Sequence, residues 1–222
     1  MPKPISIKLI FISLLIGFFF YSCSPNKNFT KPYQPAVVIT FDDYYINEWC
    51  AADAKLSSYK WKATFFVSNL PLLKKADYDN LRKLKKNGHE IGGHGYNHLN
   101  AKEYTKTNGK SKYITLEITP LIETLKNEGL PISSFAYPFG ANNQTLNFEL
   151  KKYFKIIRST SVGKPKIEEN SNFYNGTFHQ KGIGIDGNYK HFTLDYIKEV
   201  LAYARRNNKI VILYAHKPVQ KS

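Results

Sequence analysis

Short strand-like segments alternate with helical segments along most of this chain, and this alternation restricts the fold more than any other feature. The strand-like runs lie at residues 36–41, 63–67, 89–93, 132–137, 155–158 and 209–214. The helical patterns lie at residues 47–59, 77–87, 111–128, 144–153 and 193–208. Residues 164–189 show little periodicity and predict a long loop. Repeated strand–helix units predict a parallel sheet or a barrel.

Length and composition indicate one globular domain. The chain has 222 residues, of which 42% are hydrophobic and 15% aromatic, and this composition excludes an intrinsically disordered protein. Its 32 Lys and Arg residues exceed its 17 Asp and Glu residues, which gives a net charge of +15. The excess is consistent with attraction to an anionic surface or with a solvated basic surface. Because the chain has no zinc-finger spacing and no dense basic–aromatic tract, we expect no nucleic-acid partner.

The first 23 residues have the pattern of a targeting segment. Lys3 and Lys8 make its start positive, and the apolar stretch at 9–21 is short for a spanning helix but typical of a signal segment. Ser22 and Cys23 follow at once, in the arrangement of a bacterial lipoprotein cleavage site. We therefore expect Cys23 to become a lipidated N-terminus. An ordinary secretory signal and an uncleaved anchor are the alternatives.

These features predict a signal segment at 1–23, a polar tether at 24–35 and a folded domain at 36–222. A lipid on Cys23 would place the domain at the cell envelope, anchored to the membrane and facing the periplasm or the exterior. Cys50 is then the one cysteine left, which argues against a disulfide framework and favours a buried structural thiol in a helix. We expect a monomer.

Polar side chains follow several of the predicted strands. Asp42 and Asp43 end the first strand, and His94 and His98 follow the third. His216 ends the last strand. In parallel α/β folds the carboxyl ends of the strands share one face, where catalytic groups collect. We therefore expect these side chains to form one site.

The two histidines suit a metal centre. Their spacing of four residues is by itself a weak signal, because surface or capping histidines also show it. The nearby glycines at positions 92, 93 and 95 place the pair at a turn after a strand rather than on a regular helix. Imidazoles together with a carboxylate suit Zn²⁺ and related metals.

The paired carboxylates and the late histidine suit metal-assisted hydrolysis. Adjacent strand residues point in different directions, so one of Asp42 and Asp43 can hold a metal while the other faces the reacting water. His216 can protonate a leaving group. The alternative interpretation is structural, with the carboxylates starting a loop or capping a helix and the histidine ending a strand.

With these motifs in order, the chain resembles the polysaccharide deacetylases of carbohydrate esterase family four. Thr40-Phe41-Asp42-Asp43 matches the family's first motif, and the span from His94 to His98 matches its second. Residues 137–140 are similar to most of the third motif and residues 213–216 to the last, so the resemblance extends from about residue 36 to 216. It implies a deacetylase-like catalytic domain with a distorted (β/α) barrel, of the seven-stranded type.

The resemblance also implies roles for the residues at the motif positions. Asp43, His94 and His98 would bind a divalent metal, with Zn²⁺ expected first and Co²⁺ or Ni²⁺ as alternatives. Asp42 would be the general base and His216 the general acid.

The third motif carries one departure from the family. Tyr137, Pro138 and Phe139 would form the substrate and oxyanion side of the site, with a backbone N–H near Phe139 helping the metal to polarise an acetyl carbonyl. The family often begins this motif with an arginine that orients the base, but here the position is Ala136. Arg158, at the end of the next strand, could supply the missing charge.

The end of the chain carries two more departures. No Asp-x-x-Asp-Trp-like fourth motif is present, and Asp186 is a weak candidate for the carboxylate behind His216. The chain stops at residue 222, soon after His216, so an abbreviated C-terminal end of the barrel is expected.

The function implied by the resemblance is a metal-dependent hydrolase that removes acetyl groups from an N-acetylated polysaccharide. Its partners would be an acetylated glycan and, through the N-terminal lipid, the membrane. A hydrolase of O-acetyl esters on xylan-type glycans is one alternative. A catalytically impaired carbohydrate-binding homologue is another, which Ala136 and the short C-terminus favour.

Overall fold

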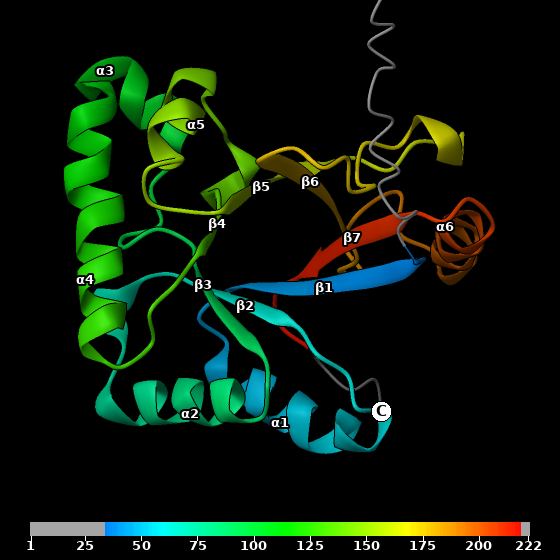
Figure 1. The fold of residues 1–222 in the computed structure, drawn as a ribbon, viewed down its shortest axis with the longest axis horizontal. Coiled ribbons are helices and arrows are strands. Elements are labelled where there is room, and N and C mark those ends of the chain that lie inside the picture. The colour runs from blue at the N-terminus through cyan, green and yellow to red at the C-terminus, as the bar shows by residue number, and fades with distance from the viewer. Residues whose placement is uncertain (1–33, 219–222) are drawn as a thin grey trace, which may run out of the picture. The chain divides into compact units, whose positions relative to one another are not determined.

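Seven parallel strands close into a barrel in the computed structural model, which describes residues 34–218 (Figure 1). In chain order the strands are β1 (Ala36–Asp43), β2 (Thr64–Val67), β3 (Glu90–Gly93), β4 (Ser134–Ala136), β5 (Ile156–Ser161), β6 (His179–Gly184) and β7 (Ile210–Ala215). Each strand pairs with the next in sequence, and β7 closes the barrel against β1, where Phe41 and Ala215 are partners in register. The predicted seven-stranded (β/α) barrel is therefore confirmed.

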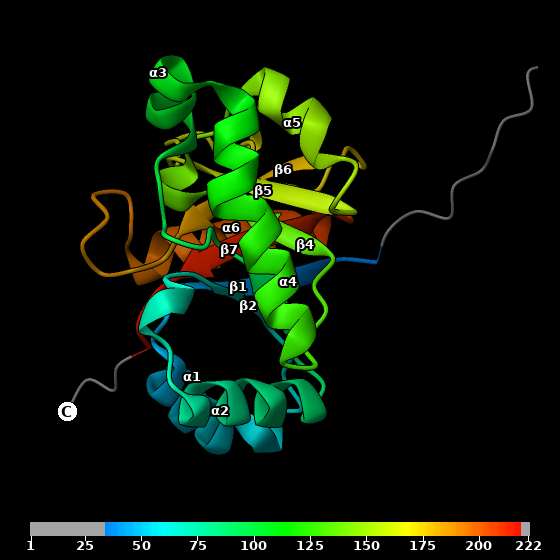
Figure 2. The same ribbon diagram turned by 90° about the vertical axis from the view of Figure 1, so that its left-hand side faces the viewer.

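Helices connect most of the strands and cover the outside of the barrel. The α-helices in the described range are α1 (Ile46–Leu56), α2 (Lys75–Lys86), α3 (Ala101–Tyr113), α4 (Thr119–Asn127), α5 (Gln144–Leu150) and α6 (Leu194–Arg206). Short 3₁₀ turns lie at 57–59, 70–72, 138–140 and 167–169, and a π-helix at 114–118 joins α3 to α4. The two ribbon views show α1 and α2 side by side, and α6 beside β7 (Figure 1 and Figure 2). The helical region predicted to start at residue 111 starts earlier, at Ala101.

The main hydrophobic core lies between the barrel and these helices. Trp49 of α1 and Phe65 of β2 are fully buried there and stack with ring centroids 5.0 Å apart. Full burial of a side chain such as Phe65 stabilises a fold by roughly 1.5–3 kcal/mol. The indole N–H of Trp49 also donates to the carbonyl oxygen of His216 at 3.0 Å. The core therefore holds the chain in place just after β7, where a site residue was predicted.

Capping side chains begin two of the helices, and a proline begins a third. Thr193 caps α6, because its hydroxyl accepts a hydrogen bond from the backbone N–H of Tyr196 at 3.0 Å. Asn143 caps α5 with its side-chain oxygen in the same way. The fixed backbone angle of Pro120 suits the first turn of α4, which begins at Thr119.

Residues 164–189 do not form one long loop, contrary to the prediction, because they contain β6. Hydrophobic patterning does not reveal β6, because the face of the sheet that carries Arg158 of β5 is continued in β6 by a polar residue and a glycine. These are Gln180 and Gly182. A Cβ on Gly182 would lie 3.2 Å from both the Arg158 and the Tyr214 side chains. The glycine that hides the strand from the pattern therefore leaves room for two large side chains.

The predicted signal segment at 1–23, the lipidation site at Cys23 and most of the tether at 24–35 lie outside the described residues. These boundaries and the monomeric state stay predictions. Between residues 34 and 218, no helix is both long enough and apolar enough to cross a membrane.

Cys50 lies in α1, as predicted, but its side chain is only half-buried. It sits at the edge of the contact between α1 and α2, with its sulfur 3.9 Å from the carbonyl oxygen of Asn80. Burial raises the pKa of the Cys50 thiol, so the thiol stays protonated at neutral pH.

Candidate metal centre and active site

A cleft of about 780 Å³ opens at the carboxyl ends of the barrel strands. The residues predicted at strand ends that line it are Asp42, Asp43, His94, His98 and His216. Parallel strands bring their carboxyl ends to one face of a barrel, so residues far apart in the sequence meet there. The structure thus places these five side chains in one site, as the sequence predicted.

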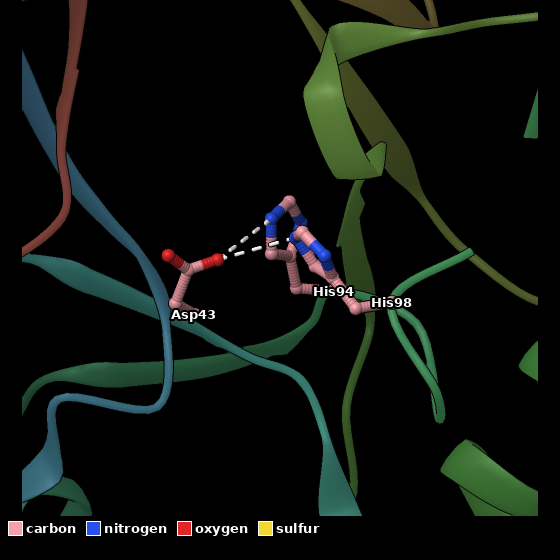
Figure 3. Close-up of side chains that lie close together, drawn as sticks. All are labelled: Asp43, His94 and His98. Carbon is pink, nitrogen blue, oxygen red and sulfur yellow. Dashed lines mark ion pairs between the residues drawn. The ribbon is translucent and has the colours of Figure 1, made fainter. Parts of the chain in front are cut away.

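Asp43, His94 and His98 form a compact cluster in this cleft. One donor atom from each residue lies within 4.8 Å of the other two. Asp43 Oδ1 is 3.2 Å from His98 Nε2 and 3.6 Å from His94 Nε2, and Figure 3 shows both rings turned toward the carboxylate. Two imidazole nitrogens and one carboxylate oxygen form a donor set typical of catalytic zinc sites. The cluster therefore fits a divalent metal with three protein ligands.

His94 is held in the tautomer that metal binding requires. Its Nδ1 lies 2.8 Å from the carbonyl oxygen of Ala136, which can only accept, so Nδ1 carries the proton and the lone pair of Nε2 faces Asp43. Burial lowers the pKa of His94 to about 4. The imidazole is therefore neutral at neutral pH, which is the form that binds metals.

Unusual backbone angles direct Asp43 and His98 toward each other. Their φ angles are 83° and 63°, in the left-handed region that residues other than glycine rarely adopt. Burial alone would raise the pKa of Asp43, but the hydrogen bond to His98 and the charges of the nearby histidines outweigh it, so this pKa lies below its ordinary value. The carboxyl group is thus ionised at neutral pH, as a metal ligand must be.

Asp42 pairs with an arginine inside the barrel. Arg158 Nη2 donates to Asp42 Oδ2 at 2.5 Å, and both side chains are almost fully buried. The guanidinium carbon lies over the rings of Phe66 and Tyr214, 5.4 Å and 4.8 Å from their centroids. Within residues 34–218, Asp42 Oδ1 has no hydrogen-bond partner. Asp42 is therefore held through one oxygen, while the other is buried without a partner.

This arginine comes from the strand next to the one where the family often has it. Ala136 of β4 and Arg158 of β5 are partners in the strand register, so their side chains leave the sheet on the same face. Arg158 thus places a positive charge beside Asp42 through one contact, from Nη2 to Oδ2, while its Nε and Nη1 have no hydrogen-bond partner within residues 34–218.

His216 pairs with Asp186, which the sequence indicated only as a candidate. His216 Nδ1 lies 2.7 Å from Asp186 Oδ2, and the backbone N–H of His216 donates to Asp186 Oδ1 at 3.1 Å. Burial lowers the pKa of His216, but the hydrogen bond to Asp186 and the charges of Asp42 and Asp186 outweigh it, so the net pKa is raised. The carboxylate therefore both orients the ring and favours its protonated form.

Only part of the predicted oxyanion side lines the cleft. Phe139 does so, with its ring centroid 4.7 Å from that of His98 and a left-handed backbone (φ 58°). The side chain of Tyr137 is fully buried instead, because its hydroxyl donates to Asn147 of α5 at 2.7 Å. Pro138 is also buried, in the turn that leads from β4 to Phe139. Tyr137 and Pro138 therefore shape this turn, and their side chains are not among the described residues that line the cleft.

One wall of the cleft was missed from the sequence. Residues 188–191, which follow β6, line the cleft. Tyr189 packs closely on Gly184, and its hydroxyl lies 3.0 Å from that of Tyr214. Because this segment follows the end of a strand, its position could have indicated that it lines the site. The sequence pattern did not predict β6, so it did not predict this wall either.

Comparison of the sequence with protein families finds a match to the family described as polysaccharide deacetylase, over residues 30–154. The match covers more than half of the chain. No curated protein sequence matches it.

Solved structures with a similar fold include three deacetylases. A Streptococcus pyogenes deacetylase in complex with acetate has a TM-score of 0.57 and 20% identity, over 74% of this chain and 69% of its own. The chitin deacetylase of Colletotrichum lindemuthianum has a TM-score of 0.52 and 16% identity, over 81% and 86%. A polysaccharide deacetylase from Bacillus cereus has a TM-score of 0.50 and 18% identity, over 83% and 80%. At these identities the likeness concerns the fold.

We expect the protein to bind about one Zn²⁺ per chain, because three converging protein donors form a catalytic type of site. Loss of a residue that only hydrogen-bonds to a metal ligand typically weakens metal binding by roughly 10–100-fold. His94→Ala and His98→Ala remove ligands themselves, so each should weaken binding by more than this. Competition with a chromophoric chelator measures this. His191→Ala, in the same cleft but outside the cluster, is the matched control. Unchanged affinity in both ligand variants would show that the metal binds elsewhere.

Proposed function

This chain belongs to the polysaccharide deacetylase family, and we propose that it is a metal-dependent hydrolase that removes acetyl groups from an N-acetylated polysaccharide. One observation carries the proposal: a cluster of metal-binding donors, a carboxylate and a histidine share one cleft, and the last two each have a charged partner. The cluster would hold the metal. Asp42 would take a proton from the attacking water, and His216 would give a proton to the departing group.

Asp43, His94 and His98 would hold the metal, with Zn²⁺ as the first candidate and Co²⁺ or Ni²⁺ as alternatives. When bound, such a metal supplies a Lewis acid for the acetyl carbonyl and lowers the pKa of water. His94 would bind it as a neutral imidazole through Nε2, because Nδ1 donates to the Ala136 carbonyl.

Asp42 would act as the general base and take a proton from the attacking water. The Arg158 guanidinium holds Oδ2, so the carboxylate cannot rotate freely, and Oδ1, although buried, has no hydrogen-bond partner among the described residues. Ala136 and the short C-terminus both favour an impaired homologue. The contact from Arg158 answers the first of these and supports the enzyme.

His216 would act as the general acid and protonate the departing amine. Asp186 accepts from Nδ1, so the proton that moves is the one on Nε2. Despite burial, the hydrogen bond to Asp186 and the nearby carboxylates raise the pKa of His216, so its protonated form, which an acid needs, extends to higher pH. A backbone N–H near Phe139 would donate to the carbonyl oxygen as negative charge develops on it.

The substrate would be an acetylated glycan, met at the cell envelope if Cys23 carries lipid as the sequence predicts. Phe139, which is mostly exposed beside His98, offers an apolar surface on which a sugar ring can lie. The net charge of +15 favours an anionic envelope polymer.

Acetate release tests the proposal directly. The protein with added Zn²⁺, Co²⁺ or Ni²⁺ should release acetate from N-acetylated glycans, and Asp42→Asn should slow this by about 10²-fold or more while the metal stays bound, because a general base contributes on that scale. Faster release from acetylated xylan would favour the ester hydrolase instead. Glycan binding with no release from any substrate would favour the impaired homologue.

A second prediction concerns the position of the arginine. Arg158→Met should retain the fold and the metal and lower the rate by up to about 10²-fold, because Asp42 loses its orienting partner. Adding Ala136→Arg to this variant should restore part of the rate, since the two positions share one face and are in register. Arg82→Met, at a surface ion pair, is the control. An Arg158→Met enzyme with full rate would remove Arg158 from the mechanism.

A third prediction concerns pH. Asp186 raises the pKa of His216, so Asp186→Asn should lower that pKa and deprotonate His216 at a lower pH. An acid must be protonated to act, so the alkaline limb of the pH–rate profile should move to lower pH. Above this limb the rate should fall by up to about 10²-fold. An unmoved alkaline limb would mean that His216 is not the acid.

A further inference from the structure

The loop that carries both histidine ligands has a tightly defined backbone. It turns sharply after β3 to bring His94 and His98 onto the same carboxylate, that of Asp43. Gly95 and His98 both have left-handed backbone angles, with φ of 84° and 63°. Such angles persist in a non-glycine residue only where neighbouring contacts impose them.

The contacts that impose this shape converge on Glu117. The backbone N–H of Asn97 donates to its Oε1 at 3.0 Å, and that of Leu99 donates to its Oε2 at 3.2 Å. The backbone N–H of Tyr96 donates to the Glu117 main-chain oxygen at 3.2 Å. His98 lies between Asn97 and Leu99 in the chain, so the Glu117 carboxylate accepts a hydrogen bond from the backbone on each side of this ligand.

Glu117 reaches the loop from a distorted part of the helical layer. It lies in the π-helix at 114–118, between α3 and α4, and is fully buried. π-helical turns are rare and often mark functional sites. A Cβ on Gly95 would lie 2.5 Å from Glu117 Oε2, so the carboxylate can approach only because residue 95 is glycine.

The orientation of the His98 ring depends on these hydrogen bonds to Glu117 more than that of His94 does. The ring of His94 is oriented directly by its bond to the Ala136 carbonyl. The His98 ring, within residues 34–218, has its polar contact with Asp43 and otherwise packs against the rings of His94 and Phe139. Its direction is therefore set mainly by the backbone that carries it.

We propose that Glu117 is a positioning residue for the metal centre, which holds His98 in the geometry that binds the metal. The role goes beyond the three donors, since Glu117 would shape the loop without touching the ion. It rests on the proposed function in one respect, namely that the cluster binds a metal.

Glu117→Gln tests the role with little change of shape. The amide offers one acceptor oxygen in place of two, and its NH₂ group would face a backbone N–H. One of the two hydrogen bonds from Asn97 and Leu99 is then lost. Zn²⁺ should then bind about 10–100-fold more weakly, the usual effect of losing an outer partner. The Co²⁺-substituted variant should also show a changed visible spectrum. Glu123→Gln removes the same charge from an exposed position on α4 and should change neither property.

Glu117→Asp provides a second variant. It keeps the charge but shortens the side chain, so its Zn²⁺ affinity should fall between those of the parent and Glu117→Gln. Thermal unfolding of the metal-free proteins identifies a purely structural role: a lower Tm with unchanged Zn²⁺ affinity in both variants would overturn the proposal. A parent protein that binds no Zn²⁺ would instead contradict the proposed function, so the two failures are distinguishable.

Discussion

The buried ion pair between Asp42 and Arg158 is the interaction on which the site depends. Two charges removed from water are costly unless they are well paired, and loss of one partner typically costs about 3–5 kcal/mol. Gly182 leaves space for the Arg158 side chain, and the guanidinium lies over the rings of Phe66 and Tyr214. The same pairing holds Asp42 beside the metal-binding cluster with one oxygen unpartnered. One contact thus pairs two buried charges and orients the carboxylate that we propose as the base.

Of the six residues other than glycine that have left-handed backbone angles within residues 34–218, three line the cleft. Asp43, His98 and Phe139 line one cleft, and all three have left-handed angles that cost on the order of 1–3 kcal/mol each outside glycine. Such strain lasts only where surrounding contacts impose it. For His98 these contacts converge on Glu117, which is buried and bound to the backbone on both sides of the ligand. The three donor groups therefore lie close together because neighbouring parts of the fold hold them there.

Much of the fold and of the site was accessible from pattern alone, and the exceptions have identifiable causes. Short strand-like runs predicted most strands, but β6 was missed because its inward positions are Gln180 and Gly182. Tyr137 belongs to a recognisable motif, yet its side chain turns toward Asn147 and away from the cleft. Glu117 carried no signal, since one acidic residue in a helical region is ordinarily a solvated one.

The sequence by itself determined the repeated strand–helix order, and with it the rule that residues at strand ends share one face. That rule was enough to bring Asp42, Asp43 and His216 to one site, because parallel strands place their carboxyl ends together. The sequence indicated Arg158 and Asp186 as candidates, but only the tertiary structure decided that they pair with Asp42 and His216, and that Glu117 accepts hydrogen bonds from the backbone on both sides of His98. These partnerships depend on register, on side-chain reach and on the space that glycines leave, and none of these is a periodic property of the chain.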